Sequence, residues 1–160
     1  MKRIHLLLLL PFIGCAPATP SAAPAPDPAA AEVVAVANRL FAAMESRDTA
    51  EIRRLFLPQA RIVSVGSQGG APVVRERSPD EFIPGIARAP EPLRERMWSP
   101  EVRIDGDLAM LWAPYDFHRG ARFSHCGTDA FQMVRLGGAW RIAALSYTVQ
   151  REGCPPAPAA

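Results

Sequence analysis

The sequence predicts an α+β domain in which helices pack on one face of a mainly antiparallel sheet. Two observations lead to this prediction. Apolar residues recur at helical spacing soon after residue 31, whereas residues 96–150 form long β-rich segments separated by glycine-containing turns. Helices followed by strands that short turns connect are typical of α+β domains, because short turns favour antiparallel pairing.

Three helices are expected before the main run of strands. The first spans residues 31–47, and its apolar face is formed by Val33, Val36, Leu40, Phe41 and Met44. The second is short, because Asp48 and Glu51 match a capping box and Pro58 ends the helix. The third begins with Ser78 as N-cap and Pro79 in its first turn, two residue types that favour helix starts.

One strand is expected at 61–65, and a meander of four strands at 96–105, 108–118, 121–136 and 139–150. A three-residue loop at 105–107 and two-residue turns at 119–120 and 137–138 would fix the register. That register places mainly apolar side chains on the inner face: Trp98, Val102, Ile104, Met110, Trp112, Phe123, Phe131, Met133, Trp140 and Ile142. Four polar residues are expected among them, namely His125, Asp129, Ser146 and Thr148.

Residues 1–14 have the pattern of a secretory signal peptide. Lys2 and Arg3 precede a short apolar run at 6–13, and Gly14 and Cys15 follow it. The run is too short for a transmembrane helix, which needs about 20 residues. Residues 12–15 resemble the lipobox of bacterial lipoproteins, in which the cysteine is acylated and becomes the first mature residue. We therefore expect a lipid anchor at Cys15 in the cell envelope, facing the periplasm, with the outer membrane favoured. Cleavage at an ordinary signal-peptide site is the alternative.

The rest of the chain divides by composition. Residues 15–30 are rich in alanine and proline and are expected to form an extended tether, residues 31–154 the folded domain, and residues 155–160 a disordered tail. Cleavage before Cys15 would remove Lys2 and Arg3, which leaves 16 basic against 16 acidic residues. A neutral domain without a basic run offers no electrostatic basis for binding nucleic acid. Contact with the membrane is expected through the lipid anchor only.

Two cysteines remain if Cys15 is acylated. An unpaired thiol is a liability in an oxidising compartment, so a disulfide between Cys126 and Cys154 is expected. Two separate thiols are the alternative, and metal ligation with help from His118 or His125 is less favoured. No metal site is expected.

The order of elements and several short segments resemble the nuclear transport factor 2 (NTF2)-like superfamily, closest to its SnoaL-like and lumazine-binding branch. The segments are 44–48 (MESRD), 131–135 (FQMVR), 140–142 (WRI) and 146–148 (SYT). The resemblance covers nearly all of residues 31–150. It implies a cone-shaped α+β barrel, with three helices on a curved sheet and an apolar pocket between them. It also implies a homodimer that forms through the outer face of the sheet.

The resemblance leaves three functions open, because this scaffold hosts many activities. The favoured one is binding of a small apolar or aromatic molecule, with pocket residues Trp98, Met110, Trp112, Phe131, Met133, Ser146 and Thr148. The second is an isomerase, dehydratase or cyclase that uses Asp129, with His125 nearby, as acid or base. A carboxyl group in an apolar pocket would suit that chemistry because desolvation raises its pKa. The third is a dimeric interaction module of the cell envelope without a ligand.

Two observations argue against the enzyme. Only one inner acid is apparent, whereas the ketosteroid isomerase-like branch uses a pair of acids with a tyrosine. The segment after the second helix, residues 58–60, also offers no acid. Separately, Arg94 and Arg96 flank an acid in a segment interpreted as a solvated face. Asp129 could instead be a structural carboxylate held by Ser146, Thr148 or an arginine. No cofactor is expected.

Overall fold

The computed structural model describes residues 27–158 of the 160-residue chain. The expected signal peptide, the acylation site Cys15 and most of the expected tether lie outside the described residues. The helices are α1 (Pro28–Ser46), α2 (Thr49–Leu55) and α3 (Pro79–Ala87). The strands are β1 (Phe56–Gln68), β2 (Ala71–Arg77), β3 (Leu93–Met97), β4 (Glu101–Asp105), β5 (Leu108–Arg119), β6 (Arg122–Leu136) and β7 (Ala139–Thr148).

The first helix, α1, begins earlier than the sequence analysis placed it. The Asp27 carboxylate accepts a hydrogen bond from the Ala29 N–H at 2.9 Å, and Pro28 occupies the first turn. Both features favour a helix start. Residues 28–30 are therefore helical, and their expected place in the tether is wrong. The helix ends at Arg47, whose φ of 58° lies in the left-handed region.

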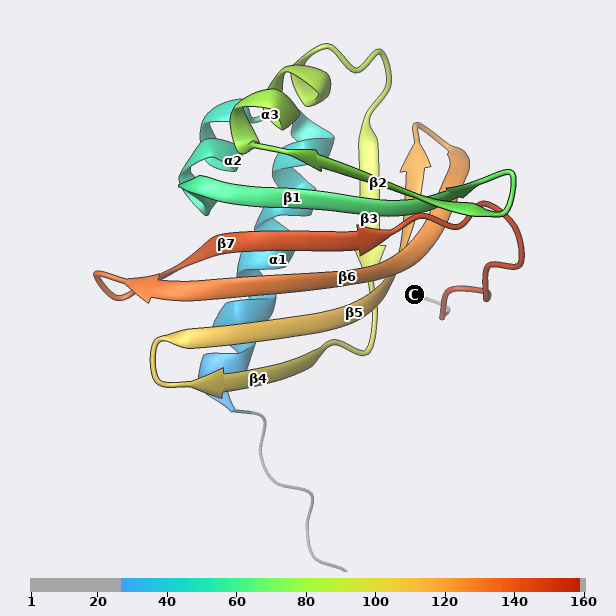
Figure 1. Ribbon diagram of the computed structural model, residues 1–160. Helices are drawn as coiled ribbons and strands as arrows, with labels where there is room; N and C mark the ends of the chain where they lie inside the picture. The colour runs from blue at the N-terminus through green and yellow to red at the C-terminus, as the bar shows by residue number, and fades with distance from the viewer. Residues whose placement is uncertain (1–26, 159–160) are drawn as a thin grey trace, which may run out of the picture.

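The two shorter helices begin where their capping patterns predict. Asp48 accepts a hydrogen bond from the Glu51 N–H at 2.9 Å, but the Glu51 carboxylate bonds to Arg39 and Arg54 instead of closing the box. At α3, Ser78 and Glu81 make both reciprocal bonds of a complete capping box. This cap fixes the start of α3, which covers one end of the sheet (Figure 1).

The seven strands form one curved, open sheet in the order β2-β1-β7-β6-β5-β3, and β4 also pairs with β5 (Figure 1). Every pairing is antiparallel except that of β1 with β7, which is parallel. The helix α1 crosses the inner face of this sheet, and the hydrophobic core lies between them. The predicted α+β class with helices on a curved sheet is confirmed.

Two strands differ from the expected set. Strand β2 was not foreseen; it returns from β1 through Gly69 and Gly70, whose φ values of 59° and 82° form the turn. The expected strand at 96–105 is divided into β3 and β4. Ser99 has a φ of 45°, and Pro100 cannot donate to a sheet ladder, so the strand is interrupted there.

The turn before β6 lies one residue later than expected. Arg119 pairs with Arg122, so residues 120–121 form the turn and every pairing between β5 and β6 shifts. The later turn by itself keeps the same side chains inward, but an extra residue at Ser124 in β6 reverses them, so Met110 and Trp112 lie on the outer face, where they are 52% and 56% exposed. Their expected inward orientation is wrong. The loop at 106–107 also has two residues instead of three, and this change together with the extra residue in β6 leaves Val102 and Ile104 packed against the core as predicted.

Two β-bulges change which side chains face inward. In β7, Met133 pairs with Ile142 as predicted, but Gln132 pairs with Ala144, so Ala143 is an extra residue. After that bulge Tyr147 turns toward the core. In β6, Ser124 is the extra residue between the partners of residues 117 and 118. Each bulge reverses the inward and outward alternation of its strand.

The bulges correct three further expectations. Phe123 precedes the bulge in β6 and is 44% exposed, so it is not an inner-face residue. Ser146 and Thr148 follow the bulge in β7 and are exposed on the outer side. The two-residue turn at Gly137–Gly138, in contrast, is confirmed, with Leu136 opposite Ala139. Within residues 27–158 no helix is both long and apolar enough to span a bilayer.

Candidate functional site

A cavity of about 370 Å³ lies between the C-terminal half of α1, the helix α3 and the inner face of the sheet. Most of its wall is apolar and includes Leu40, Phe41, Met44, Phe82, Phe117 and Leu145. A smaller set of polar side chains also reaches it: Arg77, Glu95, Tyr115, His125, Asp129 and Tyr147. An apolar cavity with a few polar groups is the usual form of a small-molecule site.

Asp129 lies on the inner face of β6 and is 1% exposed. Its Oδ2 atom has no hydrogen-bond partner among the described residues. Burial raises the pKa of Asp129 to about 7, although a hydrogen bond with Glu95 opposes part of that rise. The sequence analysis expected an acid in an apolar pocket at this position, and the structure places Asp129 in the cavity wall.

Glu95 is the second acid of the cavity, and the sequence analysis missed it. It lies on β3, is half-buried and lines the cavity. Burial and the neighbouring charge of Asp129 raise its pKa well above the ordinary value. The signal was present in the sequence, because strand alternation places Leu93, Glu95 and Met97 on one face and the flanking arginines on the other. The interpretation of this segment as a solvated face is therefore wrong for Glu95.

The two carboxyl groups interact closely enough to titrate together. The charge of Asp129 raises the cost of ionising Glu95, and burial opposes both charges. The hydrogen bond between them raises the pKa of Glu95 and lowers that of Asp129, so Glu95 donates it and Asp129 accepts it. The pair therefore retains one proton at neutral pH, and its apparent pKa values belong to the pair. Such a pair presents an acid and a base to the same cavity.

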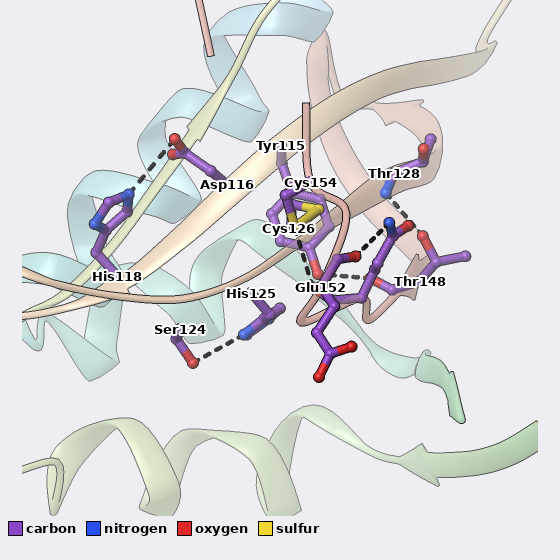
Figure 2. Close-up of a disulfide and its surroundings, with 11 residues drawn as sticks. Tyr115, Asp116, His118, Ser124, His125, Cys126, Thr128, Thr148, Glu152 and Cys154 are labelled. Atoms are coloured by element: carbon purple, nitrogen blue, oxygen red, sulfur yellow. Dashed lines mark hydrogen bonds and ion pairs between the residues drawn. A yellow bond between two sulfur atoms is a disulfide. The ribbon is translucent and has the colours of Figure 1, made fainter. Parts of the chain in front are cut away.

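Two tyrosines flank the carboxyl pair. Tyr115 is 1% exposed and donates a hydrogen bond to the Thr148 carbonyl at 2.7 Å (Figure 2). Burial and the nearby carboxyls raise its pKa above the ordinary range. Tyr147 accepts a hydrogen bond at 3.0 Å from Arg77, whose guanidinium lies 5.5 Å from the centre of the Phe82 ring. These contacts fix the Arg77 side chain at the cavity wall.

Gly127 makes room for Tyr115. A Cβ atom at this position would lie 2.1 Å from the Thr148 carbonyl oxygen and 2.8 Å from Cε1 of the Tyr115 ring. Any side chain would therefore displace the strand or the ring. The glycine is required by close approach, because its φ is not in the left-handed region.

His125 lines the same cavity but does not form a dyad with Asp129. The two residues are four apart on one strand, which separates them by about 13 Å along the strand. The His125 ring stacks on Phe117, with centroids 4.8 Å apart, and Nδ1 lies 3.0 Å from the Ser124 hydroxyl (Figure 2). Burial, with the charges of Arg151 and Arg119, lowers the pKa of His125 to about 4. His125 is therefore neutral at pH 7.

None of the seven expected pocket residues lines this cavity. Met110 and Trp112 are on the outer face, Phe131 and Met133 are core residues, and Trp98 lies in the connection between β3 and β4. Ser146 and Thr148 point outward beyond the bulge at Ala143, and the Thr148 hydroxyl accepts a hydrogen bond from the Thr128 N–H. The bulges at Ser124 and Ala143 explain most of these differences.

The expected disulfide between Cys126 and Cys154 is present, with a Cα–Cα distance of 6.0 Å (Figure 2). A two-way backbone bridge between Cys126 and Gln150 lies beside it. Together they hold the segment that follows β7 against β6. No group of three metal-ligating side chains is assembled in the described part of the chain.

The carboxyl pair makes the free energy of unfolding depend on pH. Carboxyls titrate near pH 4 in unfolded chains, whereas burial raises the pKa of Asp129 to about 7 and raises that of Glu95 as well. The folded state then binds more protons than the unfolded state, so the free energy of unfolding falls as pH rises. The fall is at most about 1.4 kcal/mol per pH unit for each extra proton bound. His125 has the opposite effect, but only between its folded pKa of about 4 and its ordinary value near 6.5.

Urea unfolding between pH 6.5 and 8 therefore isolates the carboxyls. We expect the wild-type midpoint to fall across this range and the fall to shrink in Asp129→Asn. The matched control is Asp105→Asn, which changes an exposed acid on β4. Equal slopes in all three proteins would contradict the shared proton.

Known proteins support the same fold. Residues 28–148 match the model of the family described as "Putative lumazine-binding". An NTF2-like protein of unknown function from Silicibacter pomeroyi is 24% identical, with a TM-score of 0.56 over 75% of this chain and 94% of that chain. A "putative dehydratase" of the NTF2-like family from Streptomyces avermitilis is 14% identical, with a TM-score of 0.59 over 76% and 95%.

A third structure is the β subunit of a "putative aromatic-ring-hydroxylating dioxygenase" from Novosphingobium aromaticivorans. It is 13% identical, with a TM-score of 0.64 over 76% of this chain and 89% of that chain. No curated protein matches the chain. Identities this low support the fold and leave the activity open. The family match spans most of the described domain, so the chain belongs to the family described as "Putative lumazine-binding", and its fold is that of the NTF2-like structures.

Proposed function

We propose that the domain binds a small, mainly apolar or aromatic molecule in the cavity between α1, α3 and the sheet. The observation that carries this proposal is the cavity itself, which is about 370 Å³ in volume and has apolar walls. Its size falls within the range of small-molecule sites, which begins at about 300 Å³. Glu95 and Tyr147 supply the polar groups that could orient such a molecule.

A variant that fills the cavity tests this proposal. Ala89 lines the cavity and is half-buried, so Ala89→Phe places a ring in the space that the molecule would occupy. Ala87→Phe is the matched control, because Ala87 is exposed at the end of α3 and does not line the cavity. We expect native mass spectrometry of protein from its own cells to show a retained molecule in the wild type and control, and none in Ala89→Phe. Wild-type protein that releases no small molecule on denaturation would contradict the proposal.

We also propose a homodimer that forms through the outer face of the sheet. Met110 and Trp112 are more than half exposed there, and exposed apolar side chains on one face favour association. The same native spectra report the assembly, and a mass of one chain at micromolar concentration would contradict the dimer. A dimer without a retained molecule would favour the interaction module.

A second candidate function is an enzyme of the isomerase, dehydratase or cyclase type. The specific observation in its favour is the second inner acid, because Glu95 and Asp129 hold acid and base forms side by side. Glu95 is the more exposed of the two acids. A substrate would therefore contact Glu95, and Asp129 would influence whether Glu95 is protonated. This changes the expected role of Asp129 as the lone acid or base.

Hydrogen exchange at carbon distinguishes this enzyme from a binding protein. An acid and base pair would catalyse deuterium uptake next to the carbonyl of a cyclic ketone such as 2-tetralone. We expect a rate above the buffer background in D₂O that falls at least about tenfold in Glu95→Gln and in Asp129→Asn, but not in Asp105→Asn. Exchange at the background rate in the wild type would contradict the enzyme, and ligand binding would remain as the proposed function.

We further propose that Cys15 anchors the chain in the cell envelope, where the domain faces the periplasm from the outer membrane. The support is the sequence pattern at residues 1–15, and the disulfide in the domain fits an oxidising compartment. Cells fed an alkyne-labelled fatty acid should label the wild type and Ser21→Ala. Cys15→Ser should lose the label and leave the membrane fraction. Labelling of Cys15→Ser equal to that of the wild type would contradict the anchor.

A further inference from the structure

Arginines without an acidic partner gather at the entrance of the cavity. Eight arginines of the described domain form ion pairs with acids elsewhere on the surface. Five others have no acidic partner among the described residues and line the cavity or an adjoining groove: Arg75, Arg77, Arg88, Arg119 and Arg151. Three more arginines of the described domain, Arg47, Arg103 and Arg141, also lack an acidic partner but line neither space. Five of the eight arginines without an ion pair therefore lie together, and this cluster leaves positive charge uncompensated at one place.

The groove adjoins the cavity. Four residues line both: Arg77, Arg119, His125 and Tyr147. The cavity side of this boundary is mainly apolar, whereas the groove side is polar and basic. A molecule that spans the boundary would therefore place an apolar body inside and a charged group at the arginines.

The acids near this boundary do not neutralise it. Glu76 lines the groove but pairs with Arg61 on the neighbouring strand. Glu95 and Asp129 share a proton within the cavity wall. The lowered pKa of His125, to which Arg151 and Arg119 contribute after burial, reflects the same positive field. Each of these features leaves the entrance attractive to an anion.

Arg77 is held in place before any ligand arrives. Its guanidinium donates to the Tyr147 hydroxyl at 3.0 Å and lies over the Phe82 ring, and the side chain is half-buried. A fixed, planar guanidinium retains further N–H donors in a geometry that matches a carboxylate or a phosphate. Arg151 lines the groove and lies between Gln150 and Cys154, the two residues that hold the C-terminal segment against Cys126.

We propose that the ligand of this site is an amphipathic anion, with an apolar or aromatic body in the cavity and one carboxylate or phosphate at Arg77 and Arg119. The inference rests on the proposed function and adds the chemical class of its ligand. The five arginines attract the acid group of the ligand, and the apolar wall of the cavity contacts its apolar or aromatic part. Neutral molecules with the same apolar part bind more weakly, because they leave the arginines without an anionic partner.

Two matched probe series test the inference. One is 2-naphthol, 2-naphthoate and 2-naphthyl phosphate, and the other is decanol, decanoate and decyl phosphate. Titration calorimetry with the disulfide-bonded protein gives the ratio of anion affinity to neutral affinity within each series. We expect a ratio of about ten or more in the wild type for at least one series, and it should decrease with added salt. Comparing carboxylate with phosphate identifies the preferred acid.

Single arginine variants complete the test. We expect the ratio to fall about tenfold in Arg77→Gln, which is half-buried, and about threefold in Arg119→Gln, which is exposed and more screened. Arg103→Gln is the control, because Arg103 is exposed on β4, has no ion pair and lines neither the cavity nor the groove.

The outcomes separate the two proposals. Neutral and anionic probes that bind equally, with ratios unchanged in Arg77→Gln and Arg119→Gln, would overturn the anion inference and leave the proposed function intact. An equal fall in Arg103→Gln would also overturn it, because the effect would then come from net charge. If no probe of either series binds, both the proposed function and the inference fail.

Discussion

A carboxyl group that is buried without a positive partner must hold a proton or meet a proton donor, and Asp129 is in this position. It lies on the inner face of β6, is 1% exposed and faces the cavity. The nearest compensation is Glu95, a second acid, so the two groups share a proton instead of forming an ion pair. The neighbouring acid Asp116, in contrast, is paired with Arg96 and His118. The protonation of one pair therefore determines the chemistry of the whole cavity.

The surrounding fold keeps this pair in place. Strand β3 brings Glu95 across from β6, although β5 lies between them in the sheet order, and the curvature of the sheet makes their approach possible (Figure 1). Gly127 allows the Tyr115 ring to lie against the backbone of β7, where its hydroxyl is bonded. The helices α1 and α3 form the side of the cavity that lies opposite the sheet. Binding, and proton transfer if it occurs, both depend on this enclosure, because water would lower the pKa of both acids.

Most of the fold could be predicted from the sequence, but the composition of the site could not. Capping residues such as Asp48 and Ser78 act locally, so the helix starts were predictable. The register depended on single residues: an extra residue at Ser124 turned Trp112 outward, and an extra residue at Ala143 turned Tyr147 inward. Bulges of this kind have no clear sequence signal. Glu95 was recognisable by alternation, whereas the gathering of arginines from β2, β5 and the C-terminal segment required the three-dimensional structure.

The most direct test of the shared proton is a carboxyl titration by ¹³C nuclear magnetic resonance on the labelled domain with its disulfide intact. The account predicts that the carboxyl carbons of Asp129 and Glu95 do not complete their titration below pH 6 and that their curves are coupled. It also predicts that Glu95→Gln changes the curve of Asp129. If both carbons titrate independently below pH 5, as exposed acids do, the central claim is wrong.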